Sequence, residues 1–385
     1  MHALRRSGFP PFLPFLPFLP YPMPIFLPGL TLNRRFYSEA VRPILSREFP
    51  GLAYSAALIG YGSDVLRFDT EQSTDHNWGP RLQLFLSSAD FVQLRAAIDQ
   101  TLRDRLPLTF LGYPVNFSAP DLSDGGTQRM EAVDEGPVRH LIEITTVDAY
   151  FRRYLGVAPD DTLTAVDWLV LPQQQLLEIT AGEVFHDGLG ALEPARTRFT
   201  WFPHDVWLYR MRAQWARIGQ EEAFVGRTGQ AGDELGSRIV AARLVRDLMR
   251  LTFLQERRYA PYNKWLGTAF SRLSCADFLT PLFEAALTAL DWTSRQQPLA
   301  EAYEIVARMH NDLAVTPPVD PTVRPFFSRP FTVLFAGRFA DALKAAITDE
   351  TLRELPPVGA VDQFVDSTDL TDESRLAATL RAVYG

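Results

Sequence analysis

Cysteine, lysine and long apolar runs are all scarce in this chain of 385 residues. The one cysteine, Cys275, excludes an internal disulfide framework and a zinc site built from four cysteines. Lysine supplies only two of the 38 basic residues, Lys264 and Lys344, so arginine carries most of the positive charge. No stretch of about 18 unbroken apolar residues occurs, which argues against a transmembrane helix. We therefore expect a cytoplasmic protein with no membrane partner.

The charge balance is acidic, with 46 Asp and Glu residues against 38 Lys and Arg residues and a net charge of −8. Nucleic acid is therefore not the expected partner, although a local basic groove remains an alternative. Hydrophobic residues make up 46% of the chain and charged residues 22%, as in typical globular proteins. The length allows two to three domains.

The chain begins with a proline-rich segment, in which nearly every third residue between positions 10 and 28 is proline. Proline at this spacing prevents the continuous helix of a signal peptide and favours polyproline II or disorder. We predict a disordered leader over residues 1–22, or a leader that is not translated because translation starts at Met23. A ligand for a proline-binding module is the alternative.

Beyond the leader, the hydrophobic pattern changes near Pro203. Before this point, the patterns predict short strands over residues 54–59, 75–86, 108–117 and 138–146, a hairpin over 176–188, and helices over 33–49 and 88–106. After it, long helical patterns follow one another from Asp205 onward. The predicted fold class is α+β, with a mixed sheet and helices in residues 23–203 and a C-terminal α-helical bundle in residues 204–385.

The segment from residue 59 to residue 81 carries the strongest functional signal. An apolar run ends in Gly62 and Ser63, whose backbone N–H groups and hydroxyl can approach a phosphate without intervening bulk. Asp75 and Asn77 are two residues apart on the predicted second strand, so both side chains project from one face and can offer oxygen ligands to Mg²⁺. Arg81 shares that face and is a candidate for phosphate contact, with a salt bridge or solvent exposure as the alternative.

This layout resembles the nucleotidyltransferase superfamily of the DNA polymerase β type, in which Gly-Ser precedes an Asp-x-Asp strand. Residues 62–66 (GSDVL) and 73–81 (STDHNWGPR) more closely resemble a bacterial family, domain of unknown function 4037, which is regarded as nucleotidyltransferase-like. Further matching stretches are AGEVFHD, FVGR, PYNKWLG and DQF, at residues 181–187, 224–227, 261–267 and 362–364. The resemblance covers about residues 25–385 and implies the fold without specifying the reaction.

The superfamily pattern also implies a third carboxylate on a later strand. Glu143 lies between apolar neighbours in a predicted strand, where a lone buried carboxylate is costly and a metal would offset that cost. An edge-strand position facing water is the alternative for Glu143, and Asp121 is the fallback ligand. The pattern expects Asp where this chain has Asn77, which can bind a metal but brings no charge. Asp75 and Glu143 are thus the predicted catalytic residues, and Asp75, Asn77 and Glu143 the predicted ligands of Mg²⁺.

Two positions in the helical half are further candidates for nucleotide contact, beside Gly62, Ser63 and Arg81. Arg250 belongs to a stripe of arginines on an otherwise apolar helix, and the stripe meets either neighbouring carboxylates or a cleft that holds a triphosphate. Lys264 lies at a predicted helix start, and related antibiotic nucleotidyltransferases close their helical domain over the nucleotide. The resemblance therefore implies a phosphate contact for Lys264.

Two functions follow from these residues. The first is a Mg²⁺-dependent nucleotidyltransferase that moves an NMP group from an NTP to a hydroxyl or amine of an unknown small-molecule acceptor. The second is a nucleotide-binding or regulatory protein of the same fold, in which the missing charge at Asn77 has impaired catalysis.

Overall fold

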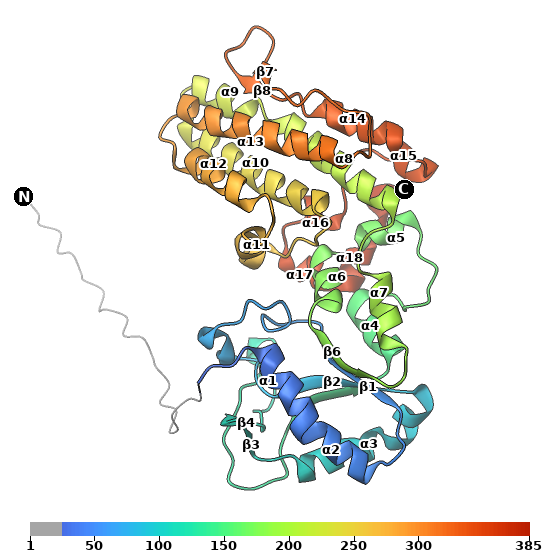
Figure 1. Cartoon of the computed structure of the whole chain (residues 1–385). Helices are drawn as coiled ribbons and strands as arrows, with labels where there is room; N and C mark the ends of the chain where they lie inside the picture. The colour runs from blue at the N-terminus through green and yellow to red at the C-terminus, as the bar shows by residue number, and fades with distance from the viewer. Residues whose placement is uncertain (1–24) are drawn as a thin grey trace, which may run out of the picture.

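Residues 25–385 are described by a computed structural model, in which a small sheet flanked by helices precedes a larger group of helices (Figure 1). The predicted α+β class, the mixed sheet and the C-terminal helical part are confirmed. The predicted leader over residues 1–22 lies outside the described residues. Among the helices of the described part, none combines the length and the apolar character needed to cross a bilayer.

Four strands form one mixed sheet in the order β5-β2-β1-β6. The strands are β1 (Tyr54–Leu58), β2 (Arg81–Leu86), β5 (Leu141–Thr145) and β6 (Glu183–Asp187). β1 pairs antiparallel with both β2 and β6, whereas β2 and β5 run parallel. Every residue of β1 and β2 is buried, as expected for central strands covered on both faces.

Helices pack on both faces of this sheet. On one face, α1 (Gly29–Phe36) continues through a π-helical turn (Tyr37–Val41) into α2 (Arg42–Glu48), and α3 (Ser88–Arg105) packs beside α2. Their apolar side chains form a core with the strand residues that point toward them, such as Ala56 and Leu84. On the other face, Tyr150 and Phe151 of α4 (Val147–Leu155) pack against Ala57 and Phe85.

Short elements connect these pieces. They are a 3₁₀ turn (Glu71–Asp75), the hairpin of β3 (Thr109–Phe110) and β4 (Tyr113–Pro114), a second 3₁₀ turn (Leu122–Asp124), α5 (Ala165–Val170), α6 (Gln173–Thr180) and α7 (Leu192–Arg198). In Figure 1, α4 to α7 occupy the middle of the molecule, between the sheet and the helical part.

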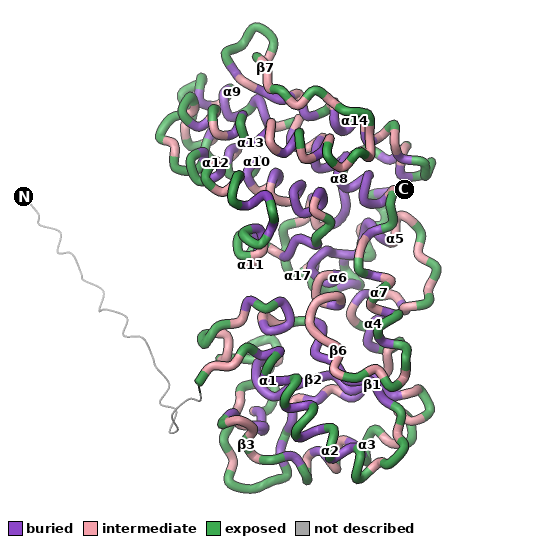
Figure 2. The backbone as a smooth tube through the Cα atoms, in the orientation of Figure 1, coloured by how far each residue is buried: buried purple, intermediate pink, exposed green. Residues whose placement is uncertain are grey.

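The helical part is built around α8, α10 and α13. Its elements are α8 (His204–Glu221), α9 (Phe224–Gln230), α10 (Glu234–Gln255), α11 (Asn263–Phe270), α12 (Ala276–Thr288), α13 (Trp292–Asp312), the hairpin of β7 (Arg324–Pro325) and β8 (Thr332–Val333), α14 (Gly337–Ala346) and α15 (Glu350–Glu354). Buried residues concentrate along α8 and α10 (Figure 2). One apolar core runs from Ala57 and Phe85 through Trp207 to Leu343, so packing is continuous across the predicted domain boundary at residue 203, which stays a prediction.

The last described residues return to the middle of the molecule. They form α16 (Val361–Phe364), α17 (Thr368–Thr371), α18 (Ser374–Thr379) and a 3₁₀ turn (Leu380–Tyr384). α18 packs on α4 and α5, and Arg381 forms an ion pair with Asp167 of α5. This segment therefore lies beside α4 and α6, which come much earlier in the sequence (Figure 1).

Three sequence predictions are wrong. The single strand predicted over residues 108–117 is instead the β3–β4 hairpin, because Leu111 and Gly112 have positive φ and turn the chain. The strand predicted over residues 75–86 begins only at Arg81, because Glu71–Asp75 is a 3₁₀ turn closed at its start by Thr70 and Ser73. Asn77 follows with a left-handed φ of 48°, which ends any extended run from Asp75. The hairpin predicted over residues 176–188 is instead α6 followed by β6, with Leu176 and Ile179 buried at helical spacing.

Candidate functional site

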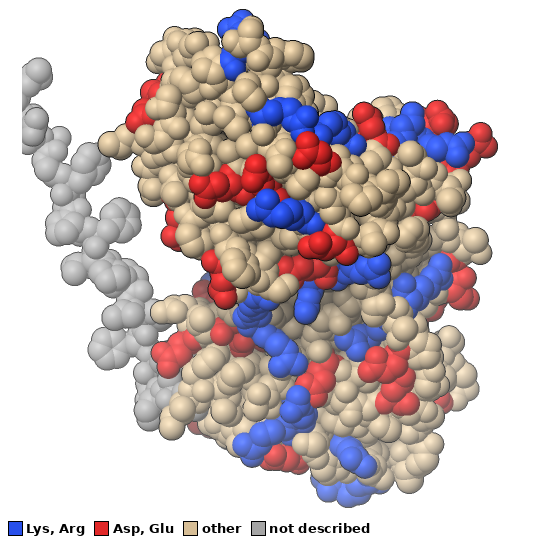
Figure 3. Space-filling view, turned by 45° about the horizontal axis from the view of Figure 1, so that its top comes forward, with Lys and Arg blue, Asp and Glu red and all other residues tan. Residues whose placement is uncertain are grey.

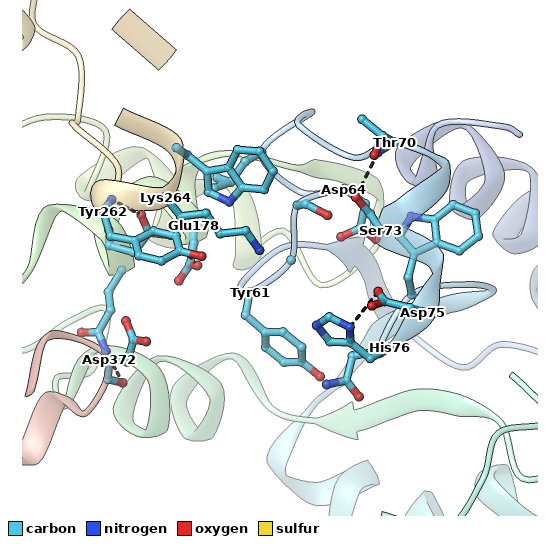
Figure 4. A pocket seen from close by; sticks show the side chains of 18 of the residues that line it. Tyr61, Asp64, Thr70, Ser73, Asp75, His76, Glu178, Tyr262, Lys264 and Asp372 are labelled. Carbon is cyan, nitrogen blue, oxygen red and sulfur yellow. Dashed lines mark hydrogen bonds and ion pairs between the residues drawn. The ribbon is translucent and has the colours of Figure 1, made fainter. Parts of the chain in front are cut away.

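A cavity of about 640 Å³ lies where the sheet, the middle helices and the helical part meet. Five stretches of chain line it: the loop from Tyr61 to Trp78, helix α4, helix α6, the start of α11, and Asp372, which caps the end of α17. Figure 4 shows Asp75, Ser73 and Thr70 on one side, with Glu178, Tyr262 and Asp372 on the other. The cavity thus brings together residues from both ends of the described chain.

The turn at Gly62 and Ser63 comes four residues after the end of β1 and lines the cavity. Gly62 has a φ of 132°, and an added Cβ would lie 2.3 Å from Asp64 Oδ1 and 2.4 Å from Arg81 Nη2. Only glycine fits this conformation and this space, so the turn has no side chain at position 62 beside the cavity. Leu66 N–H and Phe68 N–H close the turn by donating to the Gly62 and Ser63 carbonyls.

Arg81 lies beneath this turn rather than in the cavity. Its guanidinium forms a buried ion pair with Asp64 at 2.7 Å and donates to the Tyr61 carbonyl at 3.0 Å. The Arg81 and Asp64 side chains are 3% and 1% exposed. Of the two roles considered for Arg81, the structure shows the salt bridge. Its contacts with Asp64 and the Tyr61 carbonyl hold the Gly62 turn in place.

Asp75 and Asn77 both line the cavity, but they do not share a strand face. The Asp75 carboxylate is exposed and lies 2.7 Å from His76 Nδ1. Asn77 Oδ1 accepts the Gln128 N–H at 3.0 Å, and the Asn77 N–H donates to the Gln128 carbonyl at 2.8 Å. The Asn77 oxygen therefore fixes the loop against residues 127–130 instead of standing free for a metal.

Glu143 lies outside the cavity lining. It sits on β5, which is an edge strand, and forms an ion pair with Arg153 of α4 at 2.5 Å. Arg153 itself lines the cavity. Within residues 25–385, no group of three His, Cys, Asp or Glu side chains is placed to hold a metal ion. The structure does not bring Asp75, Asn77 and Glu143 together in one group, because Asn77 is held by Gln128 and Glu143 by Arg153. A Mg²⁺ site stays a prediction.

The two candidates from the helical part are separated by the structure. Lys264 is exposed at the start of α11 and lines the cavity, with its Nζ 5.1 Å from the centre of the Trp265 ring. Arg250 lines a smaller neighbouring cavity of about 40 Å³ with Asp362 and Asp366. Its Nη2 is 3.6 Å from Asp366, and burial lowers its pKa. Other arginines of the stripe also form ion pairs with carboxylates, so the stripe contacts neighbouring acidic residues.

Sequence reasoning missed the residues of the α6 wall. Glu178 accepts hydrogen bonds from the Tyr154 hydroxyl and from Gln174 Nε2, the latter at 2.7 Å. Burial raises the pKa of Glu178 to about 7, and the nearby Asp372 carboxylate adds to the rise. Gln174 Oε1 also accepts the Tyr262 N–H at 2.9 Å, which holds the start of α11 against α6. The signal was available, because a helical interpretation of residues 173–180 would have placed Gln174, Gln175 and Glu178 on one face.

Comparison with known proteins adds a family match. Residues 168–266 match a family model described as domain of unknown function, DUF4037. The resemblance is confirmed over this segment. The DUF4037 match runs from α5 into α11, so it includes Glu178, Tyr262 and Lys264, whereas the Gly62–Ser63 turn precedes it. No curated protein matches the chain.

One solved structure is also similar, a nucleotidyltransferase-like protein from Exiguobacterium sibiricum 255-15. The two chains are 11% identical, with a TM-score of 0.32, and the similarity covers 72% of this chain and 78% of the other.

Proposed function

We propose that the cavity binds a nucleoside triphosphate and that the protein transfers its nucleotidyl group to a hydroxyl or amine of a small acceptor. One observation carries this proposal. The Gly62–Ser63 turn and Lys264 are about 200 residues apart in the sequence, yet they line the same cavity. Bare backbone N–H groups, a hydroxyl and an ammonium group are the donors that a phosphate chain requires.

The charge of the cavity rim supports a ligand with phosphates at this place. Lys264 forms no ion pair with any carboxylate in the described part of the chain and contacts the Trp265 ring instead. Arg153 adds a second cation at the lining, although Glu143 shares it. Over the face shown in Figure 3, basic and acidic side chains are interspersed.

Transfer would join the acceptor oxygen or nitrogen to the α-phosphorus and break the bond between the α-phosphorus and the bridging oxygen. Pyrophosphate would leave with that bond's electrons, and the acceptor would lose one proton to a base or to water. Dependence on Mg²⁺ is part of the proposal. Of the three predicted ligands, only Asp75 lines the cavity with side-chain oxygens that accept no backbone N–H group. No step of the transfer is assigned to a metal here.

A specific observation favours a second function, nucleotide binding without transfer. Asn77 Oδ1 is engaged by Gln128 and Glu143 by Arg153, so two of the three side chains expected for catalysis have other partners. In this case the Gly62–Ser63 turn and Lys264 would still hold the phosphates.

The first prediction tests nucleotide binding. We expect ATP, GTP, CTP or UTP with Mg²⁺ to raise the melting temperature, since a ligand at a hundredfold excess over its Kd stabilises by about 2.7 kcal/mol. Lys264→Gln should weaken NTP binding about tenfold, because a charge-assisted hydrogen bond contributes about 1.5–3 kcal/mol. Lys344→Gln is the matched control, since it removes the other lysine, which lies on α14 away from the cavity.

The readouts are melting curves and calorimetric titration for the parent and both variants. The absence of any shift with all four NTPs at millimolar concentration would remove the nucleotide proposal. Incubation with α-³²P-labelled NTPs and cell extract then separates the two functions. Transfer of label to an acceptor supports the enzyme, and binding without transfer supports the second function.

A further inference from the structure

We propose that the wall of the cavity formed by Gln175, Glu178 and Asp372 is a binding site for a protonated amine. The inference rests on the proposed function only in naming this amine as part of the acceptor. The wall lies across the cavity from Asp75 and Ser73 (Figure 4). With a nucleotide held at the Gly62–Ser63 turn, this side of the cavity would stay free for a second molecule.

The first support is that two carboxylates of the wall have no cationic partner. Glu178 and Asp372 are carboxylates from two different segments, and neither forms an ion pair with any residue in the described part of the chain. Burial raises the pKa of the Tyr262 hydroxyl, and the charges of Asp372 and Glu178 add to the rise, so the three groups lie close together. A ligand that fits this wall must supply positive charge and hydrogen-bond donors.

The second support is an unpartnered acceptor at the same wall. Gln175 lines the cavity, is 4% exposed, and its Oε1 has no hydrogen-bond partner within residues 25–385. Its orientation is fixed, because Nε2 donates to the Asp372 carbonyl at 2.9 Å. A buried carbonyl oxygen without a donor is costly, and a bound donor would remove that cost.

The third support is the match between the donors of an amine and the acceptors of the wall. An alkylammonium group has three donors, and the wall offers an amide oxygen and two carboxylates as acceptors. Tyr262 and Trp265 also line the cavity and provide aromatic faces, which attract cations. A divalent metal ion is less suited, because the described residues provide no group of three metal-binding acidic, histidine or cysteine side chains here.

Amine binding must release protons near neutral pH. Burial raises the pKa of Glu178 to about 7, so its carboxyl is about half protonated at pH 7. A bound cation favours the carboxylate and expels that proton. The groups around Glu178 are Tyr150 and Tyr154 from α4, Tyr262 and Lys264 at the start of α11, and Asp372. The pKa values of Tyr150 and Tyr154 are raised by burial, so these hydroxyls stay protonated at pH 7.

The test uses 1,3-diamino-2-propanol as the probe and glycerol as its matched control, since glycerol carries hydroxyls in place of the amines. Calorimetric titrations of the full chain at pH 7 are run in phosphate and in MOPS, whose ionisation enthalpies differ and neither of which carries a primary amine. We expect the diamine to bind at least about tenfold more tightly than glycerol. Its apparent enthalpy should differ between the two buffers in the direction of proton release.

Two variants make the test specific. Glu178→Gln should abolish proton release, and Asp372→Asn, whose side chain makes no hydrogen bond within the described residues, should weaken diamine binding about tenfold without unfolding the protein. Glu135→Gln, at an exposed position, is the control and should match the parent. Equal affinity for diamine and glycerol, or diamine binding that survives both variants with unchanged proton release, would overturn the inference.

The outcomes also separate this inference from the proposed function. Diamine binding with proton release in a protein that binds no NTP keeps the amine site and removes the nucleotide proposal. NTP binding in a protein that does not discriminate diamine from glycerol removes the amine site alone.

Discussion

The buried pair of Arg81 and Asp64 shows how single residues shape the cavity without contacting a ligand. Both side chains are almost completely buried, and the guanidinium also holds the Tyr61 carbonyl. The pair fills the space behind Gly62 where a Cβ would otherwise fit. A phosphate at the turn would therefore meet backbone that is held rigidly from below.

We predict that Arg81→Met destabilises the protein by about 3–5 kcal/mol, because it leaves the Asp64 carboxylate buried without a partner. The double variant Arg81→Met/Asp64→Leu should recover most of this loss, since no buried charge remains. Urea unfolding of the parent, the single and the double variant measures both effects. A double variant as unstable as the single one would show that packing, not charge, decides the stability here.

Some of the site could be predicted from neighbouring residues, and some could not. The Gly62–Ser63 turn was predictable because a glycine after an apolar run is a local signal. Asn77 was misplaced because its left-handed φ is coupled to Gln128, 51 residues away in sequence. Asn tolerates this backbone conformation better than most residues, which provides a structural reason for Asn at this position.

At the scale of elements, the connection between α6 and β6 fixes the position of α6, and with it Glu178, relative to the sheet. Gly182 lies in this connection with a φ of 74°, and an added Cβ would be 2.1 Å from the Leu58 carbonyl oxygen. Its N–H donates to the Val65 carbonyl at 3.1 Å, next to the Gly62 turn. The connection therefore couples the α6 wall to the phosphate side of the cavity.

The Gly182→Ala variant tests this close contact. Gly190→Ala is the control, because Gly190 also has a positive φ of 64° but has no atom within 4 Å of an added Cβ. We expect Gly190→Ala to cost about 1 kcal/mol from the backbone conformation alone. Gly182→Ala should cost clearly more, because the β1 backbone must also shift. Equal losses in chemical denaturation would show that the connection is free to move.

The elements themselves were predicted unevenly. The long helix α8 begins at His204, one residue from the predicted start at Asp205, because it carries several turns of helical periodicity. α6 was predicted as part of a hairpin, because eight residues with buried glutamines show little periodicity. The edge position of β5 depends on strand order, which local sequence does not encode.

The stability of the whole molecule should depend on pH through Glu222, which ends α8. Its carboxylate accepts the N–H groups of Leu334, Phe335 and Ala336 and is 6% exposed. Burial raises its pKa from 4.5 to about 7, more than these hydrogen bonds lower it. The native state thus holds the proton more tightly than the unfolded state.

The sign of the effect follows from this difference. The contribution of Glu222 is complete below about pH 4.5 and is lost as the pH rises toward 7, on the order of 2–3 kcal/mol. We predict that Glu222→Gln reduces the fall in unfolding free energy between pH 5 and pH 8, whereas the exposed Glu350→Gln leaves it unchanged. An unchanged fall in the Glu222 variant would show that its carboxyl is ionised throughout this range.

The overall assembly could not be predicted from the sequence. The change from strands to helices near residue 203 was visible, but the return of residues 361–384 to α4 and α5 was not. Asp372 therefore gave no functional signal, since the cavity residues near it, Gln175 and Tyr262, belong to distant parts of the sequence.

This return has a consequence for synthesis of the protein on the ribosome. The Gly62–Ser63 turn emerges early, α6 and Lys264 emerge later, and Asp372 emerges near the end of the described chain. Under the proposed function, a nascent chain acquires the proposed phosphate contacts before the proposed amine wall is complete. Translation that stops before Asp372 would therefore yield a chain whose cavity lacks one of the two carboxylates of that wall.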